Sequence, residues 1–138
     1  MGGALTSGGG VRRCYLAALR VSPGGATSWN PNANTFVNAL AIQSGVVYVG
    51  GVFTQVGGKP RNSLAAVDAA TGATSNWNPS ANNTVYALAV SGTKVYVAGG
   101  FTQAGGQARN RLAALDVTTS LPSSWNPNAN NIVYSIAL

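Results

Sequence analysis

The sequence has 138 residues, is 46% hydrophobic and only 7% charged, and contains 18 glycines. This length suits one domain, and the composition is too apolar for a disordered tail and too poor in charge for an exposed helical bundle. The net charge of +6 comes from eight basic residues and two carboxylates, and no apolar run reaches the length of a membrane span.

An internal repeat organises the chain. The tryptophans stand at positions 29, 77 and 125, a spacing of 48 residues, and the same shift superposes the flanking sequence without a gap. For example, "FTQVGGKPRNSLAAVD" at 53–68 falls on "FTQAGGQARNRLAALD" at 101–116. We treat residues 1–138 as a single repeat array, with repeats at 5–52 (divergent), 53–100 and 101–138 (truncated).

Short apolar runs bounded by turn residues predict strands in every repeat. In chain order these strands lie at 36–42, 47–51, 63–68, 84–90, 94–101, 111–116 and 132–138. A weaker fourth strand, ending in tryptophan, is predicted at 73–77 and 121–125. Residues 84–90 are apolar on both faces, which is typical of a strand buried on both sides. No stretch shows the 3.6-residue period of an amphipathic helix.

Four short antiparallel strands in every repeat, placed between like neighbours, predict an all-β, propeller-like array of just under three blades. A β-solenoid usually has a much shorter coil, and a sandwich does not require a strict period. The array begins within a blade and ends on a lone strand at 132–138, whose unpaired edges predict self-association unless the chain is part of a longer propeller. Two copies would supply about six blades, enough to close a ring, whereas a contact that does not close would give a fibre.

The segments "GGxFTxxGGxxRNxLAAxD", "TG", "WNPNANxxVYALAV" and "VYVGG" recur in register. Together they resemble the bacterial delta-60 type β-propeller repeat, a domain of unknown function in large secreted or surface proteins. The resemblance covers nearly the whole chain and implies a propeller fold and an extracellular or cell-surface location, although no signal peptide is visible. It implies no activity for particular residues. The first repeat departs from the pattern, with Arg20 in place of aspartate and Cys14 in place of asparagine.

Residues suited to catalysis are scarce. There is no histidine, and the two carboxylates, Asp68 and Asp116, occupy equivalent positions in neighbouring repeats. General acid–base catalysis and metal binding normally need more such groups, so we expect no enzyme, cofactor or metal. Each aspartate is expected to accept N–H bonds from the turn that follows its strand. Cys14 is the only cysteine, which excludes an intramolecular disulfide.

Binding residues are predicted on one face of the array. In an up-and-down blade, the loops at 54–62 and 102–110 share a face with the Asn-rich connections that follow the tryptophans. The tentative binding residues on this face are Arg13, Arg61, Asn62, Arg109 and Asn110. They could bind carboxylates or sugar hydroxyls, or they could satisfy loop carbonyls within and between blades. We favour the second interpretation because the Arg–Asn pair recurs in both well-formed repeats.

The tryptophan motif is predicted to mark the junction between blades. Its members are Trp29, Asn30, Pro31, Trp77, Asn78, Pro79, Trp125, Asn126 and Pro127. Packing is expected to cover the aromatic rings, which leaves no platform for stacking sugars or bases. The sequence therefore predicts a non-enzymatic, self-assembling structural module. The alternative is a ligand-binding module for a glycan or polyanion; nucleic acid is not expected as a partner, and no membrane span is expected.

Overall fold

The computed structural model describes residues 7–8, 11–12 and 33–137. These residues form strands β1 to β12, all paired antiparallel, and contain no helix. The prediction of an all-β fold is confirmed. The described sheets do not close into a barrel or a ring.

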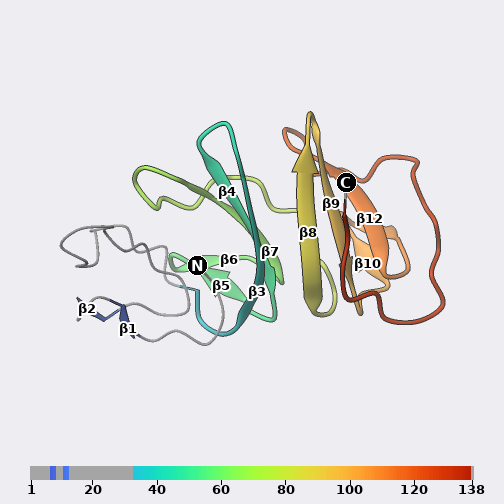
Figure 1. The fold of residues 1–138 in the computed structure, drawn as a ribbon, viewed down its shortest axis with the longest axis horizontal. Coiled ribbons are helices and arrows are strands. Elements are labelled where there is room, and N and C mark those ends of the chain that lie inside the picture. The colour runs from blue at the N-terminus through green and yellow to red at the C-terminus, as the bar shows by residue number, and fades with distance from the viewer. Residues whose placement is uncertain (1–6, 9–10, 13–32, 138) are drawn as a thin grey trace.

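Two three-stranded sheets form the body of the molecule (Figure 1). The first has β4 between its neighbours and comprises β3 (Val37–Gln43), β4 (Val46–Gly51) and β7 (Leu64–Asp68). The second has β9 between its neighbours and comprises β8 (Val85–Ser91), β9 (Lys94–Gly99) and β12 (Leu112–Asp116). Each strand of the second sheet begins 48 residues after its counterpart in the first, so the sequence repeat is also a structural repeat.

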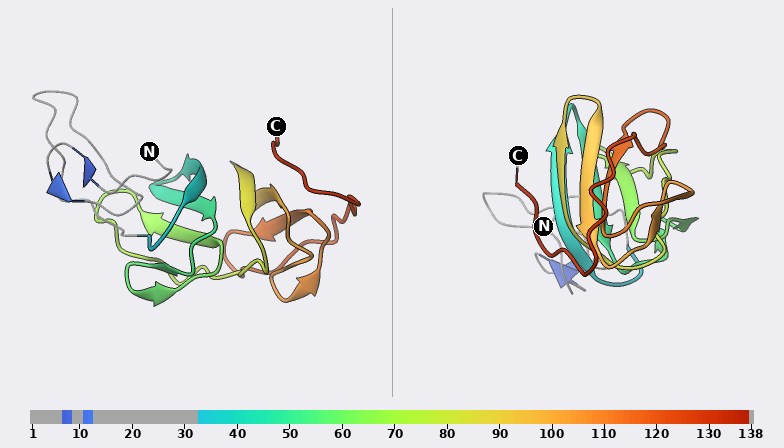
Figure 2. Two further views of the ribbon diagram at one scale, coloured as in Figure 1. Left: turned by 90° about the horizontal axis from the view of Figure 1, so that it is seen from below. Right: turned by 90° about the vertical axis from the view of Figure 1, so that its right-hand side faces the viewer.

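Three two-residue hairpins recur at the same spacing. They are β1 (Ser7–Gly8) with β2 (Val11–Arg12), β5 (Gln55–Val56) with β6 (Lys59–Pro60), and β10 (Gln103–Ala104) with β11 (Gln107–Ala108). The turns of the second and third hairpins are glycine pairs with φ between 60° and 81°, a backbone conformation that glycine adopts without steric cost. Figure 2 shows these two hairpins along the same edge of the molecule. The sequence pattern predicts only loops at these three hairpins.

The two sheets pack face to face, with β8 against β3 and β4. Tyr48 and Ala66 of the first sheet join Leu88 and Val97 of the second in one buried cluster. Amide side chains also cross between the sheets: Asn38 Nδ2 donates to the carbonyl of Val85 at 3.1 Å. We call this sheet-to-sheet interface the central seam.

The predicted fourth strands are wrong. Residues 73–77 and 121–125 contribute only single bridges, Val67 to Thr74 and Leu115 to Pro122. In each segment an arginine donates to the carbonyl that lies just after the bridge, Arg61 to Ser75 and Arg109 to Ser123. Both segments therefore run beside the sheet without joining it as strands.

The strand predicted at 132–138 is also wrong for the residues that the structure describes there. Residues 132–137 form no strand, and their one backbone bond to the sheet runs from the N–H of Val133 to the carbonyl of Gly99, at 3.2 Å. The equivalent strand β8 pairs along its length with β9, the strand that follows it. Residues 132–137 pair with no strand within the described part of the chain.

Gly50 sets how closely the two sheets approach. A Cβ at this position would lie 2.6 Å from Cγ1 of Val85 and 3.0 Å from Cδ2 of Leu88, both in the opposite sheet. Gly50→Ala should therefore lower the free energy of unfolding by about 1–3 kcal/mol through overpacking. Urea denaturation measures this cost. Gly100→Ala is the matched control, because its Cβ meets nothing closer than 3.6 Å, and an equal loss in both variants would contradict the steric explanation.

Candidate functional site

Trp77 joins the two sheets at the central seam. Its ring is 6% exposed and meets Tyr48 edge to face, with centroids 5.2 Å apart and an interplanar angle of 82°. Its Nε1 donates to the carbonyl of Asp116 in the second sheet at 2.9 Å. Because the ring packs on one sheet and its N–H bonds to the other, Trp77 fixes the position of the two sheets relative to each other.

Trp125 occupies the same place one repeat later, but its ring is open to solvent. It meets Tyr96 edge to face at 5.5 Å and 90°, as Trp77 meets Tyr48, yet it is 42% exposed. Among the described residues, its Nε1 has no hydrogen-bond acceptor. Tyr134 is 65% exposed. The prediction that packing covers the aromatic rings is therefore wrong for Trp125 and Tyr134.

The Asn–Pro pair after Trp77 makes its hydrogen bonds through the backbone. The N–H of Asn78 donates to Oγ of Ser120 at 3.1 Å, and the carbonyl of Pro79 accepts the N–H of Gly105 at 2.9 Å. The counterparts Asn126 and Pro127 are exposed. The remaining predicted positions, Arg13, Trp29, Asn30 and Pro31, lie outside the described residues.

Asparagine side chains bind the second and third hairpins, a role that sequence analysis missed. Oδ1 of Asn34 accepts the N–H groups of Thr54 at 2.9 Å and Gln55 at 3.1 Å, and Nδ2 donates to Oγ1 of Thr54 at 2.8 Å. Asn82 makes the same three bonds, at 2.8, 3.0 and 2.8 Å, to residues 102 and 103. The sequence signal was the recurrence of this asparagine 48 residues apart, opposite a recurring "FTQ".

The residue before each of these asparagines pairs with the same hairpin. Ala33 forms an antiparallel bridge with Val56, and Ala81 forms one with Ala104. All four residues are at most 2% exposed. We call each Ala–Asn pair, 33–34 and 81–82, a clamp, because its backbone and its asparagine side chain together hold one hairpin.

Backbone carbonyls accept hydrogen bonds from the guanidinium groups of two predicted binding residues, Arg61 and Arg109. Arg61 donates to Pro60 at 2.6 Å and to Ser75 at 2.7 Å. Arg109 donates to Ala108 at 2.7 Å and to Ser123 at 2.8 Å. Arg61 is only 8% exposed, and Nε of both arginines is buried without a hydrogen-bond partner among the described residues. In both described repeats the guanidinium therefore satisfies carbonyls of its own repeat.

Asn62 and Asn110, which follow the two arginines in sequence, each bond to the Asn-rich connection that comes after the next tryptophan. Nδ2 of Asn62 donates to Oγ of Ser80 at 3.4 Å, and Nδ2 of Asn110 donates to Oδ1 of Asn128 at 2.6 Å. The structure thus brings the hairpin loops and the Asn-rich connections together, as predicted. The arginines and asparagines do not converge on one site, because the arginines bond within their repeats.

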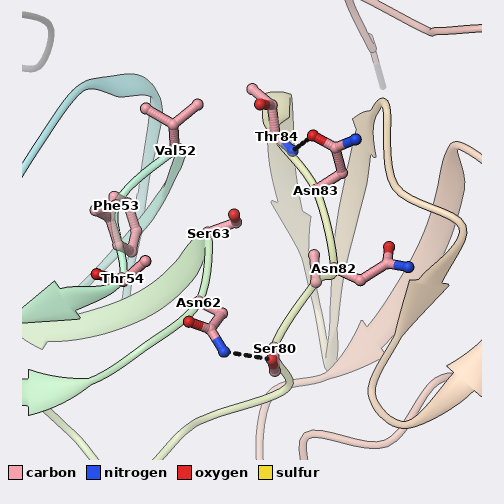
Figure 3. A pocket seen from close by; sticks show the side chains of 10 residues that line it. Val52, Phe53, Thr54, Asn62, Ser63, Ser80, Asn82, Asn83 and Thr84 are labelled. Atoms are coloured by element: carbon pink, nitrogen blue, oxygen red, sulfur yellow. Dashed lines mark hydrogen bonds between the residues drawn. The ribbon is translucent and has the colours of Figure 1, made fainter.

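A pocket of about 370 Å³ lies on this face, where the chain passes from the first sheet to the second (Figure 3). Its lining is uncharged, and its polar side chains are Thr54, Asn62, Ser63, Ser80, Asn82, Asn83 and Thr84. Some of these polar groups already have a hydrogen-bond partner within the protein, since the N–H of Thr84 donates to Oδ1 of Asn83 at 2.7 Å. With no cationic side chain in its lining, the pocket matches hydroxyl-rich ligands better than a polyanion.

Both aspartates close the turns after their strands, as predicted. Oδ1 of Asp68 accepts the N–H groups of Ala70 and Thr71, each at 2.8 Å. Oδ1 of Asp116 accepts those of Thr118 at 2.8 Å and Thr119 at 2.9 Å, and Oδ2 lies 3.3 Å from Nζ of Lys94. The backbone N–H groups, with a smaller contribution from Lys94, lower the pKa of Asp116 to about 2. The pKa of Asp68 is also lowered, chiefly by the N–H of Thr71.

Acid should therefore destabilise the fold. The folded pKa of Asp116 is about 2, below the value of about 3.9 for an unfolded chain, so its stabilising effect is complete above pH 4 and is lost as the pH falls toward 2. We expect the free energy of unfolding, measured by urea titration at each pH, to decline across this range. Asp116→Asn should flatten the decline in part, with Asp68 supplying the rest. An unchanged pH profile in the double variant Asp68→Asn, Asp116→Asn would contradict this assignment.

Within residues 7–8, 11–12 and 33–137, no three metal-ligating side chains gather in one place, and no helix is long and apolar enough to span a membrane. Comparisons of the chain with protein-family models, curated proteins and solved structures found no match.

Proposed function

We propose that this chain is a non-enzymatic structural module built from propeller blades of the delta-60 type, and that it assembles through its second sheet. The support comes from two equivalent sheet faces that differ in how much of each is exposed to solvent. The face of the first sheet that carries Tyr48 and Trp77 is covered by the second sheet, and these rings are 5% and 6% exposed. The equivalent face of the second sheet is more open, because Tyr96 is only partly buried and Trp125 is 42% exposed.

The open face has the composition of a protein interface. It borders a hollow of about 560 Å³ lined by Tyr96, Leu112, Ala114, Trp125, Val133 and Ile136, among others. Trp125, which lines this hollow, is 42% exposed. An exposed apolar surface of this kind is typical of a site that binds another protein. Another blade matches its shape, because the covered counterpart already holds one.

Sedimentation velocity over a range of protein concentrations tests this proposal. We expect species larger than the monomer, with electron micrographs separating a closed ring from a fibre. Trp125→Ser places a polar group in the open face and should shift the population toward monomer. A dispersed wild-type monomer at every accessible concentration would reject assembly. The resemblance that motivates the blade assignment also supports a location outside the cell or on its surface.

The uncharged pocket in Figure 3 supports a second candidate function, binding of a neutral glycan. Amide and hydroxyl groups of Asn83 and Ser63 would bond to sugar hydroxyls there, while the predicted arginines take no part. A glycan array probed with wild type and with Asn83→Ala tests this candidate. Asn126→Ala is the control, because Asn126 is an exposed asparagine that does not line this pocket. Absence of binding, or equal binding by both variants, would reject this pocket as the site.

A further inference from the structure

A third clamp stands at Ala129–Asn130, one repeat after Ala81–Asn82. Its backbone is anchored in the same way: the N–H of Ala129 donates to the carbonyl of Asn110 at 3.2 Å, as that of Ala81 donates to Asn62 at 3.1 Å. The clamp is therefore already in place on its own repeat.

This third clamp holds no hairpin within the described part of the chain. Ala129 forms no bridge there, and Asn130 is exposed and has no hydrogen bond to a described residue. Ala33 and Ala81, by contrast, are 0% and 2% exposed beneath their hairpins. The third clamp shares the backbone anchor of the second clamp, and no hairpin of residues 7–8, 11–12 or 33–137 lies against it.

The hairpin β1–β2 has the matching form. Ser7 pairs with Arg12 and Gly8 with Val11, the same register that joins Gln55 to Pro60 in the clamped hairpin β5–β6. Gly8 stands where the clamped hairpins have Val56 and Ala104. Among the described residues, Gly8 pairs only with β2.

We propose that the Ala129–Asn130 clamp of one chain binds the β1–β2 hairpin of a second copy. This inference rests on the proposed self-assembly and names its partner and its register. Ala129 bridges to Gly8, the N–H of Asn130 donates to the carbonyl of Ser7, and Oδ1 of Asn130 accepts the N–H of Ser7. These bonds reproduce the ones that Asn34 and Asn82 make within the chain.

Two consequences follow from this contact. The contact joins unlike ends of the chain and is therefore heterologous. Two copies that each bind the hairpin of the other form a closed dimer. If the contact does not close in this way, it continues from copy to copy as a filament. It also brings another repeat to the open side of the second sheet, where Trp125 lies. The clamp supplies the register and the apolar face supplies most of the buried area.

Disulfide trapping tests the register. In a Cys14→Ser background, Gly8→Cys with Ala129→Cys should form an intermolecular disulfide under mild oxidation, seen on a non-reducing gel and located by peptide mass spectrometry. Ala81→Cys with Ala104→Cys is the positive control, because these residues are bridged within one chain and should cross-link intramolecularly. Gly8→Cys with Asn126→Cys is the negative control. A yield no higher than this negative control overturns the inference.

Affinity gives an independent readout. Asn130→Ala removes the side-chain bonds to the hairpin and should weaken association about tenfold or more, while Asn126→Ala should leave it unchanged. Both positions are exposed, so circular dichroism should show both variants folded. Association that is unaffected by Asn130→Ala and yields no specific cross-link overturns the proposed register but leaves self-assembly standing. A monomeric wild type overturns both.

Discussion

Replacing Trp77 with alanine should cost about 3–5 kcal/mol of unfolding free energy, a large share of the stability of a small domain. The ring is 6% exposed between the two sheets, so its removal leaves a cavity at the central seam. The variant also leaves the carbonyl of Asp116 without the indole N–H that it accepts at 2.9 Å. Urea denaturation followed by circular dichroism measures the loss.

Trp125→Ala is the matched control for this variant. The same residue type at the same repeat position is 42% exposed and bonds to no second sheet within the described chain, so its loss should cost clearly less. This comparison belongs at a concentration where the protein is monomeric, since assembly would cover Trp125. Equal costs for the two variants would show that the exposure difference between the two rings does not govern stability.

The double variant Arg61→Ala, Arg109→Ala should be the second most damaging change. Each guanidinium satisfies two backbone carbonyls, and a hydrogen bond to a charged group contributes about 1.5–3 kcal/mol. We expect the larger loss at Arg61, which is the more buried of the two. The arginines share no partner, so their effects should add. Thermal and urea unfolding of the two single variants and the double variant measures this.

Lys59→Ala controls for the loss of positive charge in the same loop. Lys59 is exposed, and its one bond, to the carbonyl of Thr74, is long at 3.4 Å, so the change should be nearly neutral. The ligand-binding interpretation of the arginines makes the opposite prediction. On that view the double variant keeps its melting temperature and loses binding to a glycan or polyanion.

The sequence predicted the sheets because each main strand combines apolar residues with turn residues at its ends. The strand predicted at 94–101 is β9, shortened at its end, and the one at 84–90 is β8, shifted by one residue. The fourth strands failed for a reason that strand propensity does not report. A strand needs free carbonyls and N–H groups along its edge, and here Arg61 and Arg109 occupy the carbonyls of Ser75 and Ser123.

The site was only partly predictable. The repeat placed Arg61 and Arg109 correctly in loops, and their recurrence favoured the carbonyl-binding role that the contacts show. The clamps were missed because they join a connection to a hairpin some twenty residues away, and neither local pattern suggested the other. Periodicity also could not predict that Trp125, which occupies the repeat position of Trp77, would be exposed.

The unequal covering of the two sheets has a consequence for how the molecule opens. In an array whose repeats contact mainly their neighbours, stability is close to a sum of terms for each repeat and each interface. In the first sheet, the central strand β4 is buried on both sides, through Val47 and Val49 on one face and Tyr48 on the other. Among the described residues, no sheet covers the face of the second sheet that carries Tyr96, so amide hydrogens should exchange faster in β9 than in β4. Local unfolding should then start at the second sheet. Binding of a second copy there should slow amide hydrogen exchange in that sheet first.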